Sequence, residues 1–186
     1  MSLLDRFTTP KSIKAKGKFI VIDGADGTGK TTQIDLLAKT LIASQYDGVL
    51  LQFPQNTDIS APLLNKFHDG NYGELNPEAV SILYAIDRLD TSAELRNYLA
   101  DGKVVLAHRY VTSNAGEQGA RITNYHDRIK FYKWLDNLEY TTFGIARPDL
   151  NIILHLPADI AWETIKQRMI QGGKAGELHS AQRAYF

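Results

Sequence analysis

Hydrophobic and polar positions form blocks along the chain that predict strands and helices in turn. Apolar runs rich in β-branched residues predict buried strands at 19–22, 49–53, 104–107 and 152–156. In the first helical segment, the spacing i, i+3, i+4, i+7 is met by Ile34, Leu37, Ala38 and Leu41. Strands that alternate with helices favour a parallel sheet with right-handed crossovers. The predicted fold class is therefore α/β, with about four parallel strands flanked by helices in three layers.

The remaining helices are predicted from apolar spacing and from capping residues. Asn76 is a typical N-cap followed by Pro77, and it opens a long helix that ends near Ala100, before Gly102. The buried face of this helix is predicted from an apolar stripe formed by Ile82, Ile86, Leu89 and Ala93. Shorter helices are predicted at 61–68, 125–138 and 160–170, whereas the small, polar residues 112–124 predict a loop.

The most specific motif lies between the first strand and the first helix. Residues 24–31 read Gly-Ala-Asp-Gly-Thr-Gly-Lys-Thr, the spacing of a phosphate-binding P-loop. Its glycines let backbone N–H groups surround a polyphosphate, and the helix N-terminus adds partial positive charge. The residues predicted to bind ATP phosphates are Gly24, Ala25, Asp26, Gly27, Thr28, Gly29, Lys30, Thr31 and Thr32. Lys30 would reach the β- and γ-phosphates and the Thr31 hydroxyl would bind Mg²⁺, so ATP and Mg²⁺ are the predicted cofactors.

Further candidate residues follow from the sheet and from the long helix. Ligands of parallel sheets bind beyond the carboxyl ends of the strands, where Phe53 and Arg109 are expected to meet the P-loop. Tyr84 and Arg88 lie one helical turn apart, so they could stack a flat base and hydrogen-bond its edge. The alternative is a solvated helix face on which Arg88 pairs with Asp87 or Glu94.

Composition narrows the classes of function. The 186 residues carry 21 Lys+Arg and 21 Asp+Glu, so no overall charge favours nucleic acid or an anionic membrane. Cysteine is absent, which fits a cytoplasmic location, and no apolar run is long enough to span a membrane. Residues 1–17 are predicted to be a flexible leader, and 18–186 to form a single domain that contains the P-loop.

Five segments together resemble one family. Residues 24–33, 52–54, 84–88, 109–118 and 147–150 follow the order and rough spacing found in thymidylate kinases. The likeness extends from about Lys18 to Arg168. It implies a P-loop NTPase fold, transfer of the ATP γ-phosphoryl to dTMP to give dTDP, and a homodimer.

The resemblance also implies residue roles. Asp26 would accept a hydrogen bond from the acceptor 3′-hydroxyl, and Phe53 would pack against the acceptor. Tyr84 would stack on thymine, Arg88 and Gln118 would contact the base, and Arg109 would bind the acceptor phosphate. The implied catalytic residues are Lys30, Arg109 and Arg168, the last in a mobile lid at about 166–180.

Four positions depart from the family pattern. His108 replaces an aspartate expected to help position Mg²⁺, and Glu117 replaces an aromatic residue that contacts the deoxyribose. No arginine follows the second strand, so Arg109 would carry more of the contact with the acceptor phosphate. Gly27 stands where some members carry an arginine, so the lid is expected to supply that cation through Arg168 or Lys174. Family members generally continue beyond the position of Phe186 with further elements, so a shortened C-terminus is expected.

Three other functions are alternatives to the kinase. A deoxynucleoside kinase would need a carboxylate as general base after the second strand, and Phe53-Pro-Gln55 offers none. A nucleotide-binding protein with little or no catalysis stays open because of His108 and the short C-terminus. A GTPase is disfavoured because the guanine-reading Asn-Lys-x-Asp segment is absent.

Overall fold

The centre of the molecule is a sheet with strand order β1-β3-β4-β2-β5. The computed structural model describes residues 6–7 and 16–170; residues 1–5, 8–15 and 171–186 lie outside this description. The strands are β1 (Arg6–Phe7), β2 (Lys18–Gly24), β3 (Gly48–Gln52), β4 (Val104–His108) and β5 (Leu150–Leu154). The last four pair in parallel, which confirms the predicted sheet. β1 pairs antiparallel with β3 and comes from the predicted leader, most of which lies outside the described residues.

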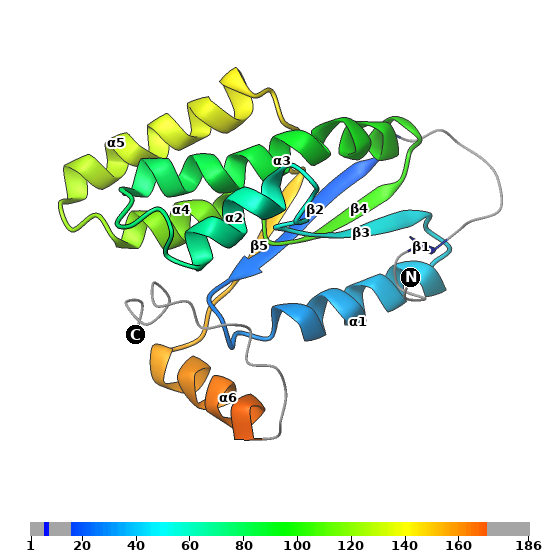
Figure 1. Cartoon of the computed structure of the whole chain (residues 1–186). Helices are drawn as coiled ribbons and strands as arrows, with labels where there is room; N and C mark the ends of the chain where they lie inside the picture. The colour runs from blue at the N-terminus through cyan, green and yellow to red at the C-terminus, as the bar shows by residue number, and fades with distance from the viewer. Residues whose placement is uncertain (1–5, 8–15, 171–186) are drawn as a thin grey trace.

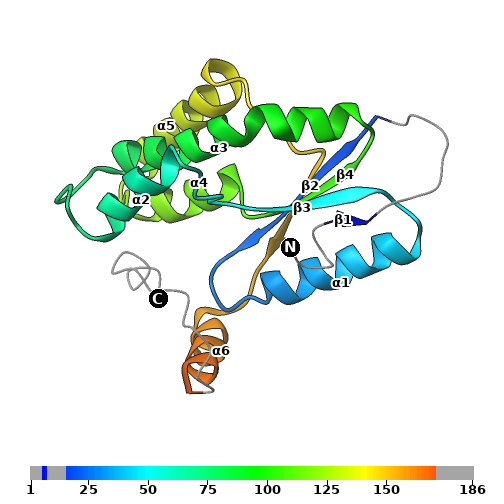
Figure 2. The same cartoon turned by 45° about the vertical axis from the view of Figure 1, so that its right-hand side comes forward.

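Helices cover both faces of this sheet (Figures 1 and 2). The helices are α1 (Lys30–Ala43), α2 (Ser60–His68), α3 (Pro77–Ala100), α4 (Val111–Ala120), α5 (Tyr125–Asp136), the π-helix η1 (Asn137–Thr142) and α6 (Ala158–Ile170). α1 covers one face, α3 and α4 pack on the other, and α2 and α5 lie against them. Among the described helices, none has the length and apolar character needed to cross a bilayer.

The core consists of two apolar clusters, one on each face of the sheet. Strand residues alternate between the faces, so Val21 points toward α3 to α5 while the adjacent Ile22 points toward α1. Ile34 and Ala38 of α1 are buried against Ile22, as their spacing predicts. These packed layers hold the carboxyl ends of β2, β3 and β4 side by side, where the P-loop begins.

The predicted loop at 112–124 is wrong, because α4 (Val111–Ala120) occupies most of it. Small residues in this segment reflect close helix packing rather than a turn. A Cβ on Gly119 would lie 2.5 Å from the Tyr132 ring of α5. Asn114 and Gln118, four residues apart, are both buried on the inner face of α4. Tertiary packing therefore outweighs the weak intrinsic helix propensity of this segment.

The predicted buried face of α3 is also wrong, although its ends are correct. Asn76 caps the helix by accepting a hydrogen bond from the Ala79 N–H at 2.7 Å. Ile82 and Leu89 are each 38% exposed, whereas Asp87 and Arg88 are almost fully buried. Buried polar groups are stable only with partners, and both side chains have them in the site described below. The inward face of α3 thus carries polar contacts, and part of its apolar stripe faces solvent.

Candidate functional site

The P-loop links β2 to α1 through glycines that adopt left-handed backbone angles. Gly27 has φ 81° and Gly29, which caps α1, has φ 88°. At Gly27 a Cβ would lie 2.3 Å from the carbonyl oxygen of Ala161. Both the angle and this contact exclude a larger residue, so the arginine that some thymidylate kinases carry here does not fit this loop. The backbone keeps the open turn that a polyphosphate needs.

Lys30 begins α1 and turns back over the loop. Its side chain is 5% exposed, and Nζ donates to the Ala25 carbonyl at 2.8 Å and contacts the Asp26 carboxylate at 3.5 Å. Burial, with a smaller effect from the positive charge of Arg109, lowers the pKa of Lys30 to about 8. A buried ammonium at the mouth of the loop is well placed to neutralise phosphate charge.

Thr31 follows in the first turn of α1 and is exposed. Within the part of the chain that the structure describes, no cluster of three His, Cys, Asp or Glu side chains could hold a metal. Mg²⁺ commonly uses one or two protein ligands together with substrate phosphates. A hydroxyl beside the P-loop fits that mode of binding, so Thr31 remains the candidate ligand.

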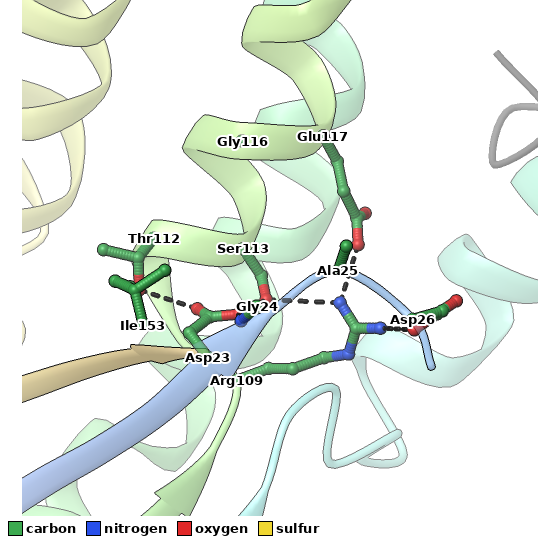
Figure 3. Close-up of a pocket in the computed structure, with 10 residues that line it drawn as sticks. All are labelled: Asp23, Gly24, Ala25, Asp26, Arg109, Thr112, Ser113, Gly116, Glu117 and Ile153. Carbon is green, nitrogen blue, oxygen red and sulfur yellow. Dashed lines mark hydrogen bonds and ion pairs between the residues drawn. The ribbon is translucent and has the colours of Figure 1, made fainter. Parts of the chain in front are cut away.

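Asp23, the last residue before the loop glycines, joins the P-loop to α4. It is 2% exposed and accepts hydrogen bonds from the Gly24 N–H and from the hydroxyls of Thr112 and Ser113 (Figure 3). Donors on two elements converge on one carboxylate here. This contact holds the start of α4 against the P-loop.

Arg109 lies at the end of β4 and reaches across this junction. Its φ of 66° is uncommon for a residue with a side chain. Its backbone N–H donates to the carbonyl oxygen of Ile22 at 3.1 Å. Nη1 donates to Glu117 at 2.7 Å and Nη2 to Asp26, so one guanidinium bridges α4 and the P-loop (Figure 3). The sequence prediction that Arg109 meets the P-loop is confirmed.

A cavity of about 530 Å³ opens beside this bridge. Its lining includes five of the six predicted acceptor-binding residues, namely Asp26, Phe53, Tyr84, Arg88 and Arg109. The other lining residues are Gln52, Pro54, Asn56, Asn65, His68, His108, Tyr110, Ser113, Asn114 and Glu117. Segments from across the sequence therefore form one chamber at the mouth of the P-loop.

Aromatic rings and Arg88 form the far end of this chamber. Tyr84 packs edge-on against Phe67 and His68 of α2, with ring centroids 6.4 and 6.3 Å away. Arg88 is 4% exposed and forms a buried ion pair with the fully buried Glu139 of η1. The alternative of a solvated helix face with Arg88 on Asp87 or Glu94 is therefore wrong. A ring beside an oriented guanidinium could stack a base and bond to its edge.

Asp87, next to Arg88, organises the loop after β3. Its carboxylate accepts hydrogen bonds from the backbone N–H groups of Gln55 and Asn56 at 2.8 and 2.9 Å, and from the Ser60 hydroxyl. The loop after β3, where the family pattern has an arginine and this chain has none, is thus held in a defined shape by a carboxylate. Arg109 is the cation of this chamber that adjoins the P-loop.

His108 occupies the position of the expected aspartate. Burial lowers its pKa to about 4, with smaller contributions from the positive charges of Arg109 and Lys30. The ring is therefore neutral at pH 7, and its buried Nε2 has no hydrogen-bond partner among the described residues. A neutral imidazole provides none of the negative charge that an aspartate would offer to Mg²⁺.

Of the predicted acceptor-binding residues, Gln118 does not line the chamber. Gln118 is 4% exposed, and its side-chain oxygen accepts a hydrogen bond from Arg121 at 2.8 Å. Arg168 belongs to α6, but its side chain lies outside the description, as do Lys174 and the rest of the lid. The sequence analysis does not identify Glu139. Its one signal in the sequence is a carboxylate directly after the apolar residues of the predicted helix at 125–138.

The comparisons with known proteins agree on one family. The family model for thymidylate kinase matches residues 22–184. The thymidylate kinase of Pelotomaculum thermopropionicum is 32% identical over 163 residues, covering 87% of this chain and 71% of that protein. The thymidylate kinase of Mycobacterium tuberculosis is 29% identical over 154 residues, covering 80% and 71%.

A solved structure supports the same architecture. Thymidylate kinase from Candida albicans superposes with a TM-score of 0.62 at 23% identity, covering 80% of this chain and 67% of that one. At this identity the likeness concerns the P-loop NTPase fold alone. Together with the family match over residues 22–184, it leads to one conclusion: this chain belongs to the thymidylate kinase family.

Proposed function

We propose that this protein transfers the γ-phosphoryl group of ATP to dTMP, giving dTDP. One observation carries the proposal: Asp26 and Arg109 at the P-loop line the same chamber as Tyr84 and Arg88. A base held at Tyr84 and Arg88 would extend its phosphate toward Arg109 and thus toward a triphosphate in the P-loop. The family and the names of its members support dTMP as the acceptor.

The chemistry would depend on position and charge rather than on a covalent intermediate. Phosphoryl transfer needs the two phosphates in line and their negative charge neutralised. Lys30 would contact the β- and γ-phosphates, and Arg109 would hold the acceptor phosphate. Mg²⁺, bound at the Thr31 hydroxyl and the ATP phosphates, would supply further charge neutralisation. Arg168 is proposed to add a cation from the lid.

A homodimer and a cytoplasmic location are part of the same proposal. Ile82 and Leu89 leave apolar surface exposed on one side of α3, next to the exposed Ala93. Apolar patches of this kind often mark protein interfaces. The chain contains no cysteine, which suits a reducing compartment.

An assay of ADP release with a panel of acceptors tests the substrate assignment. We expect the highest kcat/KM with dTMP and lower values with dUMP, dCMP and dGMP. The structurally similar Candida albicans enzyme is described as having broad substrate specificity, so each acceptor needs a full saturation curve. Equal kcat/KM values across the panel would contradict the dTMP assignment. Absence of turnover with every acceptor would contradict the kinase assignment.

The pKa of Lys30 predicts how activity depends on pH. Its pKa is lowered to about 8, so the free enzyme loses this positive charge as the pH rises through about 8. The kcat/KM for ATP reports groups of the free enzyme, and it should therefore fall above that pH. The measurement is kcat/KM for ATP between pH 6 and 10 at a dTMP concentration well below its KM, so that ATP binds to the free enzyme. A Lys30→Arg control stays charged throughout and should lack this decline, whereas a flat wild-type profile would contradict the role.

A further inference from the structure

The contact between Glu117 and Arg109 lies where the proposed function places the acceptor phosphate. Glu117 projects from α4 toward the Arg109 guanidinium, which also faces Ser113 and Asp26 (Figure 3). The Glu117 Oε1 to Arg109 Nη1 distance is 2.7 Å, and the side chains are 29% and 17% exposed. Glu117 thus places a carboxylate on the guanidinium that the proposed function assigns to a phosphate.

Among the described residues that line the chamber, Arg109 is the cation best placed to bind a phosphate. The described residues that line the chamber include two arginines, Arg88 and Arg109. Arg88 directs Nε and Nη2 to Glu139, and His108 is neutral at pH 7. An incoming phosphate next to the P-loop therefore needs Arg109.

The local charge balance works against an anion while Glu117 stays in place. Among the described residues, the cluster around Arg109 contains two cations, Lys30 and Arg109 itself, and three carboxylates, Asp23, Asp26 and Glu117. At ordinary ionisation the cluster has one more negative than positive charge. A phosphate dianion beside three carboxylates would be strongly repelled at the low dielectric of a partly buried site. One carboxylate must therefore withdraw when the phosphate binds.

Glu117 is the carboxylate best able to move. Asp23 is held by Gly24 and two hydroxyls, and Asp26 belongs to the P-loop backbone turn. A second cavity, of about 370 Å³, lies beside Glu117 and is lined by Gly116, Glu117 and Ile153 among others. This cavity also adjoins Arg109, Asp23 and Asp26, and it offers the Glu117 side chain space to rotate while α4 remains in position. Burial raises the pKa of Glu117, and the positive charge of Arg109 opposes the rise.

We propose that Glu117 is an internal competitor of the acceptor phosphate. Its carboxylate occupies Arg109 in the free enzyme, and the phosphate of the acceptor nucleotide displaces it. This inference rests on the proposed function, because it assumes a nucleoside monophosphate in the chamber. It makes Glu117 a determinant of acceptor affinity that acts on the phosphate and not on the base.

Glu117→Gln tests the proposal, since it removes the charge and retains the shape. A partly exposed ion pair contributes up to about 1 kcal/mol, so the dissociation constant for dTMP should fall about 5-fold. The constant for thymidine, which has no phosphate, should stay unchanged, as should KM for ATP. Calorimetry gives both constants. Glu94→Gln is the matched control, because Glu94 is an exposed residue of α3 outside the chamber and should leave both constants unaltered.

The outcomes separate this inference from the proposed function. An unchanged or weaker affinity of Glu117→Gln for dTMP, or an equal gain for thymidine, overturns the inference. If Glu117→Gln does not fold, Glu117→Asp shortens the carboxylate away from Arg109 and should give a gain of the same sign. If the wild type fails to phosphorylate dTMP, the proposed function fails. The inference is then decided with inorganic phosphate, which should bind more tightly to Glu117→Gln than to the wild type.

Discussion

Lys30→Ala is expected to lower kcat by on the order of 10³-fold, because removing one preorganised charge-stabilising group typically has an effect of this size. Lys30 is the buried ammonium of the P-loop, and its Nζ lies 2.8 Å from the Ala25 carbonyl. Alanine leaves the γ-phosphoryl without that charge in the transition state. The measurement is the rate of ADP release at saturating ATP and dTMP.

Lys39→Ala is the matched control for this substitution. Lys39 lies on the same helix, α1, but it is exposed and far along the helix from the P-loop. It should retain wild-type kcat. A thermal melt of Lys30→Ala separates lost chemistry from lost folding, since the variant should unfold close to the wild-type temperature. A folded Lys30→Ala variant with kcat within 10-fold of wild type would contradict the role of Lys30.

Glu139→Gln is expected to lower the free energy of unfolding by about 3–5 kcal/mol, the usual effect of removing one partner of a buried ion pair. Glu139 is fully buried and Arg88 is 4% exposed, so the substitution leaves the guanidinium charge without compensation. Urea unfolding followed by circular dichroism measures the change.

Removing both charges should cost less than removing one. Arg88→Met combined with Glu139→Leu replaces the pair by apolar side chains of similar volume, so most of the lost stability should return. The same double variant should bind dTMP more weakly, because Arg88 lines the acceptor chamber. Asp127→Asn breaks an exposed pair with Lys130 and should leave the urea unfolding midpoint close to that of the wild type. A Glu139→Gln variant as stable as Asp127→Asn would contradict the buried-pair argument.

Much of the fold could be read from the sequence because its signals are local. The four parallel strands match short apolar runs, and most helices match apolar spacing or an Asn cap. The P-loop is the clearest case, since its glycine angles and the following helix depend on adjacent residues. Tyr84, Arg88 and Arg109 were also found, because a helical turn or a strand end places each of them.

The errors occurred where distant residues decide the structure. The sequence predicts a loop where α4 lies because small residues lower helix propensity, yet packing of Gly119 under Tyr132 favours a helix there. Apolar spacing predicts the wrong buried face of α3 because it does not reveal that polar side chains have buried partners. The partner of Arg88 is Glu139, which lies 51 positions away in the sequence.

The sequence by itself therefore determined the phosphate-binding loop, the parallel α/β plan and the family, all of which follow from short-range spacing and residue order. Only the tertiary structure decided which charges meet: Arg88 with Glu139, and Arg109 with Glu117 and Asp26. The physical reason is that an ion pair depends on distance in space and on burial, and neither is set by the local chain.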